Sequence, residues 1–172
     1  MFSRIFLSLA VLSAAGAIPA RGGRGSVRAV DNESLKTPGL YQIRQHVQDY
    51  TYKYLQTNDD DQAPLQMLVP SGHEQYLPMW WVRELGDDKF DLQPYGGGIH
   101  AAVAPGSNSV IGSEKSGPLS TWAIESSGNN LWTIKVPGRN LVWKSNSNSS
   151  ISLESAEGTA DEKWDFNYYG GP

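Results

Sequence analysis

Apolar and polar residues alternate in short runs along most of the chain, between positions 40 and 168. Alternation with a period of two is typical of β-strands that bury one face, and Gly, Pro, Asn and Ser at the ends of the runs favour turns. Twelve such runs predict strands at residues 40–45, 50–56, 66–69, 79–85, 89–93, 100–104, 109–113, 121–126, 131–136, 141–145, 150–154 and 163–168.

Three features recur at a common spacing, which indicates an internal repeat. Tryptophans 42 residues apart close the units, and an aliphatic residue stands eleven positions before each of them. Each unit opens with an aromatic or apolar pair spaced by one residue. The closing residues are Trp80, Trp122 and Trp164, the aliphatic residues are Val69, Ile111 and Leu153, and the opening pairs are Tyr41/Ile43, Phe90/Leu92 and Trp132/Ile134.

Three units of four strands predict an all-β fold of the β-trefoil type, with twelve strands in three pseudo-symmetric repeats at about 38–86, 87–128 and 129–169. In that fold six strands form a short barrel and three hairpins cap one end. A three-bladed propeller is the competing arrangement, but propellers typically need about 4–8 blades to close. Because side chains two apart on a strand share a face, the opening pairs should fill the barrel together with the closing pairs, which are Trp80/Val82, Trp122/Ile124 and Trp164/Phe166.

The first repeat departs from the other two in length. It takes 39 residues from opening to closing aromatic, whereas the second and third each take 32. The aliphatic residues stand at a constant distance from the closing tryptophans, so the extra length precedes Val69. Residues 50–55 align with the second strands of the other repeats. The extra length is therefore predicted to fall between the second and third strands. This loop, from Gln56 to Pro64, is a candidate binding site because long loops on a rigid scaffold often carry function.

Several segments resemble the fungal β-trefoil serine protease inhibitors of the cospin type, which are related to the mycocypin-type trefoil inhibitors. They are Pro-Gly-Leu-Tyr-Gln-Ile-Arg at 38–44, Pro-Met-Trp-Trp-Val-Arg-Glu-Leu at 78–85, Lys-Phe-Asp-Leu at 89–92, Leu-Ser-Thr-Trp-Ala-Ile at 119–124 and Leu-Trp-Thr-Ile at 131–134, so the resemblance extends over residues 38–168. It implies that the loop between strands two and three of the first unit carries the inhibitory residue, commonly an asparagine. Asn58 matches that position. The binding loop would comprise Gln56, Thr57, Asn58, Asp59, Asp60, Asp61 and Pro64.

A carbohydrate-binding lectin is the alternative. Trp81 and Trp143 neighbour or alternate with inward positions, so either could be exposed and stack on a sugar ring. The ricin-type lectin signature places Gln two residues before the closing tryptophan, whereas this chain has Pro78, Ser120 and Glu162 there. The partner is therefore expected to be a protease of open class or a glycan.

Composition excludes several classes of function. The formal charge of −4 argues against a nucleic-acid partner, which needs a clustered basic surface. The absence of cysteine excludes disulfides and thiolate ligands, and the three histidines do not have metal-ligand spacing. Since no nucleophile elbow occurs either, we expect no metal, no cofactor and no enzymatic activity, and a monomeric binding protein.

The amino terminus has the pattern of an export signal. Arg4 precedes an apolar run at 5–15 that is too short to span a bilayer, and Ala15-Gly16-Ala17 offers a cleavage site. We expect a signal peptide at 1–17, with cleavage as late as Ala20 as the alternative, a flexible leader at 18–37 and a domain at 38–172. The mature protein would be secreted, extracellular and without a membrane segment. Asn32 and Asn148 stand in glycosylation sequons.

Overall fold

The computed structural model describes residues 34–48, 51–58, 60–70 and 77–172, all within a compact unit that extends from Asn32 to Pro172. The predicted signal peptide, the leader up to residue 33, the sequon at Asn32 and loop residue Asp59 lie outside the described residues. The last residues of the predicted leader belong to the domain, because Leu35 packs against its core and the Lys36 backbone contacts the Tyr41 hydroxyl. The domain therefore begins before residue 38.

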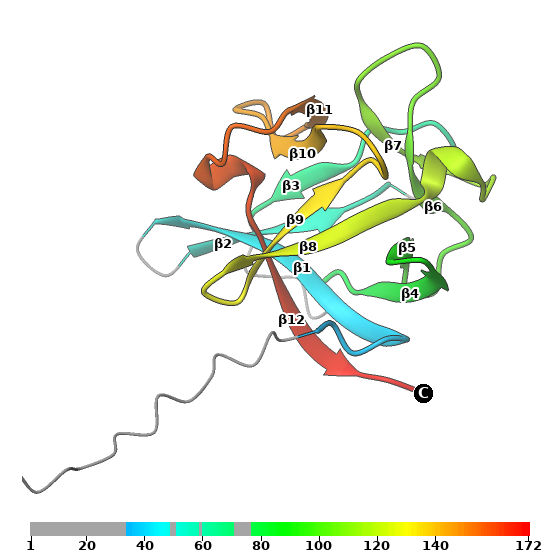
Figure 1. Ribbon diagram of the computed structural model, residues 1–172, viewed down its shortest axis with the longest axis horizontal. Helices are drawn as coiled ribbons and strands as arrows, with labels where there is room; N and C mark the ends of the chain where they lie inside the picture. Colours follow the sequence, from blue (N-terminus) through cyan, green and yellow to red (C-terminus); the bar gives the residue numbers. More distant parts are fainter. Residues whose placement is uncertain (1–33, 49–50, 59, 71–76) are drawn as a thin grey trace, which may run out of the picture. The chain divides into compact units, whose positions relative to one another are not determined.

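The described residues form twelve strands and two short 3₁₀ helices (Figure 1). All twelve predicted strands are present within a few residues of their predicted bounds, and the prediction of a β-trefoil is confirmed. The strands are β1 (Gly39–Gln48), β2 (Thr51–Gln56), β3 (Gln66–Leu68), β4 (Trp80–Gly86), β5 (Lys89–Pro94), β6 (His100–Val103), β7 (Val110–Ser113), β8 (Trp122–Gly128), β9 (Leu131–Lys135), β10 (Leu141–Ser145), β11 (Ile151–Ser155) and β12 (Trp164–Gly170), and the helices are η1 (Pro118–Ser120) and η2 (Ala160–Glu162).

Six strands close into an antiparallel barrel. The ring runs β1–β4–β5–β8–β9–β12 and returns to β1, where Leu40 pairs with Gly170 and Ile43 with Phe166. Two of its hairpins turn through paired residues with positive φ, Asp87-Asp88 and Asn129-Asn130, which is the backbone of a tight hairpin turn. The first and last strands of the domain therefore complete the barrel.

The other six strands form three cap hairpins, β2–β3, β6–β7 and β10–β11. Isolated bridges join each hairpin to the next: Pro64 to Ile111, Gln66 to Ser150 and Ser109 to Ser152. The cap is thus one connected layer. It places the β2–β3 connection directly against the second repeat.

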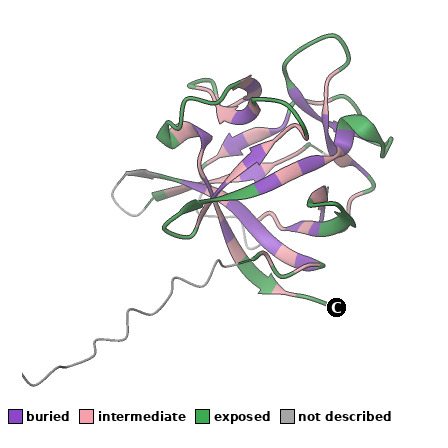
Figure 2. Cartoon of the chain, in the orientation of Figure 1, coloured by how far each residue is buried: buried purple, intermediate pink, exposed green. Residues whose placement is uncertain are grey.

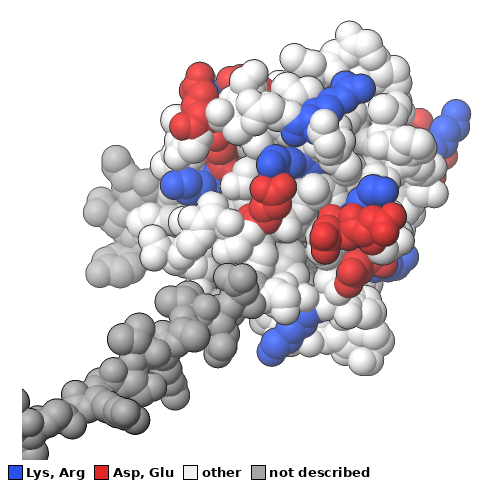
Figure 3. Space-filling model, viewed as in Figure 1, with Lys and Arg blue, Asp and Glu red and all other residues white. Residues whose placement is uncertain are grey.

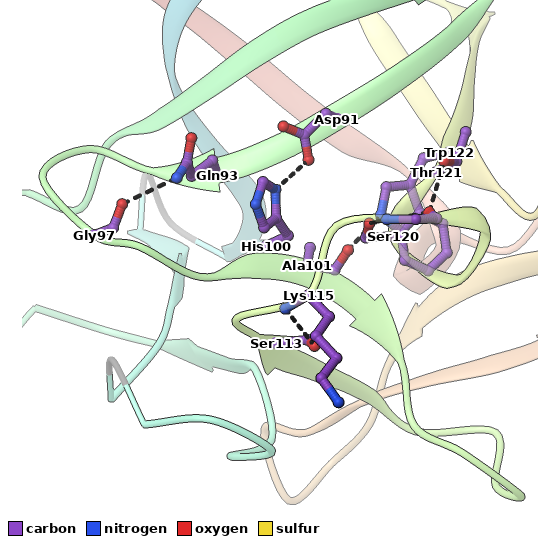
Figure 4. Close-up of polar contacts among 11 residues, drawn as sticks. Asp91, Gln93, Gly97, His100, Ala101, Ser113, Lys115, Ser120, Thr121 and Trp122 are labelled. Atoms are coloured by element: carbon purple, nitrogen blue, oxygen red, sulfur yellow. Dashed lines mark hydrogen bonds and ion pairs between the residues drawn. The ribbon is translucent and has the colours of Figure 1, made fainter.

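The closing tryptophans of the three repeats make the same contact. Buried positions lie mainly on the strands, and exposed ones are frequent in the turns and loops (Figure 2). Trp80, Trp122 and Trp164 are fully buried, and their indole Nε1 atoms donate to backbone carbonyls of Leu55 at 2.9 Å, Ala101 at 2.9 Å and Trp143 at 3.4 Å. Figure 4 shows this bond in the second repeat. Of the twelve side chains predicted to fill the barrel, eleven are buried and Phe90 is partly buried.

These bonds also identify equivalent positions in the repeats, and they correct the predicted alignment. Leu55, Ala101 and Trp143 are equivalent, and they pair with Met67, Gly112 and Leu153 on the following strands. Met67 is fully buried, whereas Val69, which the sequence spacing had aligned with Ile111 and Leu153, is 52% exposed.

The extra length of the first repeat is consequently spread over three connections. Tyr41 and Leu55 are 14 positions apart, against 11 in both other repeats, so three extra residues lie between β1 and β2. The remaining four lie partly before Met67 and partly between Met67 and Trp80. The prediction that all seven belong to the β2–β3 loop was wrong.

Candidate functional site

The connection between β2 and β3 is still the longest of the three cap loops. It has nine residues, 57–65, whereas the equivalent loops at 104–109 and 146–150 have six and five. Asn58, Asp60 and Asp61 are exposed, Thr57 is partly buried, and Leu65 is fully buried beneath the cap. The candidate inhibitory residue Asn58 therefore lies on a surface loop with a buried anchor at its end.

The second half of this loop is fixed to β7. The Gln62 amide donates to the Gly112 carbonyl at 2.9 Å, the Gly112 amide donates to the Ala63 carbonyl at 2.8 Å, and the Leu65 amide donates to the Val110 carbonyl at 3.0 Å. A Cβ at Gly112 would come within 2.6 Å of Ile99 Cδ1 and 3.4 Å of the Asp60 carbonyl. The close contact is with the end of the Ile99 side chain, whereas the loop carbonyl of Asp60 would lie at about ordinary van der Waals distance.

Asp61 adds a side-chain contact to the same attachment. Its Oδ1 accepts the backbone N–H of Glu114 at 3.0 Å and the side-chain amide of Gln62 at 3.2 Å. The Glu114 N–H, followed by the Gln62 amide, lowers the pKa of Asp61 because both donors favour the ionised carboxylate. Asp61, the last of three consecutive aspartates at 59–61, thus fixes the loop to the segment that follows β7.

We expect the attachment at Asp61 to weaken in acid. Since the pKa of Asp61 is lowered in the folded chain, its contribution is complete above the usual carboxyl pKa of about 3.9 and is lost as the pH falls through the lowered pKa. The Glu114 amide proton should therefore shift upfield over that range in NMR spectra. In Asp61→Asn the acid-dependent shift of the Glu114 amide proton should disappear. If the shift is the same in Asp61→Asn as in wild type, Asp61 is not the carboxylate that accepts this N–H.

Trp81 lies between the buried residues Trp80 and Val82 on β4, on the outer face of the barrel, and is partly buried. Its ring is 6.1 Å from that of Tyr95, which is 59% exposed. Gln93 pairs with Trp81 across β4 and β5, and its side-chain amide donates to the Gly97 carbonyl at 3.1 Å (Figure 4). Two aromatic rings and a polar side chain thus lie together at one surface of the barrel. Alternation within β5 did not identify Tyr95, because it follows the strand.

Trp143 does not belong to any surface site, so its proposed exposure was wrong. The side chain is fully buried, with its ring at nearly 90° to those of Trp122 at 4.8 Å and Trp164 at 5.8 Å. Val142 beside it is also buried. β10 belongs to a cap hairpin that packs on barrel tryptophans and is bridged to the other two hairpins, and both of these neighbouring side chains are enclosed. Strand alternation therefore could not assign Trp143 to a face.

The histidines within the described residues have structural contacts. His100 Nδ1 lies 2.7 Å from Asp91 Oδ1, which joins β5 to β6 (Figure 4), and the His46 ring packs on Tyr52 at 5.4 Å. Within the part of the chain that the structure describes, no group of three or more His, Asp and Glu side chains could hold a metal ion. In the same residues, no helix has the length and apolar character needed to cross a membrane.

Charged side chains of both signs are interspersed on the face shown in Figure 3. Several form pairs across neighbouring strands: Arg44 with Asp165 at 2.6 Å, Lys135 with Glu125 at 2.9 Å and Lys144 with Glu154 at 3.0 Å. Asn148, in the second sequon, is exposed, and its Oδ1 accepts the Ser150 hydroxyl at 2.7 Å. The sequon asparagine is thus at the surface of the domain.

Comparison with known proteins supports the fold but gives no family. No family model matches the sequence, and no curated protein matches it. Among solved structures, the designed 3-fold symmetric protein ThreeFoil is 19% identical with a TM-score of 0.62, and the alignment covers 75% of this chain and 98% of ThreeFoil. A salivary protein from Culex quiquefasciatus of the Cysteine and Tryptophan-Rich family is 16% identical with a TM-score of 0.59, covering 76% and 93%.

Larger proteins contain a similar domain. The Polyporus squamosus lectin, in a complex with the epitope Neu5Aca2-6Galb1-4GlcNAc, is 17% identical over 77% of this chain, with a TM-score of 0.58. A mosquitocidal holotoxin is 13% identical over 79% of this chain, with a TM-score of 0.64. This chain spans half the length of the lectin and 18% of the holotoxin. At these identities the likeness establishes the β-trefoil fold alone.

Proposed function

We propose that this protein is a secreted protease inhibitor that presents residues 56–64 as a substrate-like loop. The observation that carries the proposal is the combination of an exposed Asn58 with a loop whose following residues are fixed to β7 by three backbone hydrogen bonds. The resemblance of residues 38–168 to the cospin-type inhibitors points to the same loop and the same asparagine. A serine-type endopeptidase is the first target to test.

The mechanism would be pre-organisation. A loop already ordered by the scaffold loses little conformational entropy when it enters an active-site cleft, and more of the contact energy then appears as affinity. The bonds from Gln62 and Leu65 and the side chain of Asp61 restrain the residues after Asn58. Asn58 would occupy the specificity pocket of the protease, with Thr57 and Asp59 on either side, and the protein itself would act by binding and not by catalysis.

Replacing Asn58 by alanine is expected to raise the inhibition constant about 30-fold or more, because a central contact residue is typically worth about 2 kcal/mol or more. The full chain would be assayed against serine, cysteine and asparaginyl proteases. The melting temperature should not change, because Asn58 is exposed. Asn140→Ala, at another exposed asparagine, is the matched control. Inhibition that survives Asn58→Ala would show that the site lies elsewhere.

Glycan binding at Trp81 and Tyr95 is the second candidate, and the geometry of those two rings favours it. The equivalents of Trp81 in the other repeats are Ala123 and Asp165, so the candidate surface occurs once and not three times. Among the structural neighbours, a lectin appears in complex with a glycan. If no protease in the panel is inhibited and a glycan array shows binding that requires Trp81, this second function replaces the first.

A further inference from the structure

A groove of about 660 Å³ lies where the second repeat meets the third. Three segments form it: the turn that contains η1, the connection between β6 and β7, and the turn between β9 and β10. The volume is within the range of about 300–1,000 Å³ that is typical of small-molecule sites. None of the residues of the proposed inhibitory loop lines this groove.

The floor and one wall of the groove are apolar. Leu153 is buried at its base, and Val103, Val136 and Leu141 are partly buried residues that pack against the core. Leu119 forms a wall and is 53% exposed. An apolar side chain held at a rim gains free energy when a ligand covers it, at roughly 25 cal/mol per Å² of apolar surface.

The turn that presents Leu119 is fixed in place. The Ser120 hydroxyl accepts the Gly117 N–H at 2.8 Å and donates to the Gly117 carbonyl at 3.1 Å. The Thr121 hydroxyl donates to the same carbonyl at 2.9 Å, and the following residue is the buried Trp122 (Figure 4). The Leu119 backbone is therefore held between two side-chain contacts and a core tryptophan, and the groove is largely pre-formed.

The charges at the groove have one sign. Lys89 and Arg139 are among its thirteen lining residues, all of which the structure describes, and no Asp or Glu lines it. The nearest ion pair of Lys89, with Asp87 at 3.7 Å, is long and joins exposed groups, so it neutralises little. This local excess of positive charge contrasts with the net charge of −4 of the whole chain.

We propose that this groove binds a small anionic amphiphile, a molecule with an apolar body and a carboxylate or sulfonate group. The apolar body would lie between Leu119 and Leu141, over Leu153. The anionic group would meet Arg139, whose planar guanidinium can donate two parallel hydrogen bonds to such a group, with Lys89 contributing charge. This site is separate from the 56–64 loop and independent of protease inhibition.

The test is a fluorescence titration of the full chain with the anionic apolar dye 8-anilinonaphthalene-1-sulfonate, followed by displacement with decanoate. We expect saturable binding at one site that Arg139→Gln weakens about fivefold, because a charge-assisted hydrogen bond is lost at a partly screened position. Leu119→Ser should weaken binding as well. Arg83→Gln, at an exposed arginine that does not line the groove, should have no effect. Circular dichroism would verify that every variant stays folded.

Two amphiphiles with the same apolar chain and opposite charges separate the apolar contribution to binding from the electrostatic one. Decanoate should displace the dye, whereas the decyltrimethylammonium cation, with a chain of the same length, should not. Unsaturable dye binding, equal displacement by both amphiphiles, or equal effects of Arg139→Gln and Arg83→Gln would each overturn the proposal. Loss of dye binding in Arg139→Gln with unchanged protease inhibition would show that the groove and the loop act separately.

Discussion

Replacing Trp143 by alanine is expected to lower the free energy of unfolding by about 3–5 kcal/mol, the usual cost of truncating a fully buried tryptophan. The side chain occupies a position that is leucine in the first repeat and alanine in the second. It packs edge-on against Trp122 and Trp164, so its removal leaves a cavity bordered by two other large side chains. Urea unfolding followed by circular dichroism would measure the change.

The matched control for this variant is Trp81→Ala. The same substitution at a partly buried tryptophan on the outer face should cost clearly less than at Trp143, because part of the ring is already in contact with water. If the two variants had equal midpoints of unfolding, Trp143 would not be the core residue that the structure shows. The free energy of unfolding of Trp143→Phe should lie between that of the wild type and that of Trp143→Ala. This substitution also removes a buried Nε1 that has no hydrogen-bond partner among the described residues.

Replacing Glu162 by alanine is expected to lower the free energy of unfolding by about 1.5–3 kcal/mol, the typical value of hydrogen bonds to a charged group. The Glu162 side chain is 2% exposed. Its carboxylate accepts the backbone N–H groups of Glu157, at 3.1 and 3.2 Å, and Gly158, at 2.8 Å. These bonds fix the connection between β11 and β12, as Ser120 does in the second repeat.

Chemical denaturation of Glu162→Ala would be compared with that of Glu125→Ala. Glu125 is exposed, and its contact with Lys135 is a surface ion pair, so its removal should cost less than about 1 kcal/mol. Glu162→Gln keeps one acceptor oxygen and should lose less stability than Glu162→Ala. Equal losses in Glu162→Ala and Glu125→Ala would contradict the structural role of the buried carboxylate.

The strands and the fold could be predicted because both depend on local pattern and on repetition. Alternation identifies a strand that buries one face, and turn residues mark its ends. Three tryptophans at a period of 42 residues then determined the number of repeats. The barrel side chains followed directly, since residues such as Trp80 and Val82 are buried and alternate with the less buried Trp81 and Arg83 on the same strand.

The candidate site was predicted only in part, because spacing alone cannot align repeats that contain insertions at several places. Val69 has the spacing of Ile111 and Leu153, yet Met67 is the residue that enters the core. The hydrogen bond from each closing tryptophan to the facing carbonyl gives the correct alignment, and it is a contact between distant segments. Trp143 and the groove at Leu119 escaped prediction for the same reason, because packing between repeats defines both.

The closure of the barrel by β1 and β12 also determines how the domain would respond to mechanical force. Because the two strands are antiparallel neighbours, the residues before Leu40 and after Gly170 leave the barrel at the same end. A load applied through these two segments would open the β1–β12 hydrogen bonds one after another, starting at Leu40, and would not shear them all at once. The domain would therefore resist pulling through its ends weakly, however stable its tryptophan core makes it at equilibrium, because forced unfolding depends on a rate and on the geometry of loading.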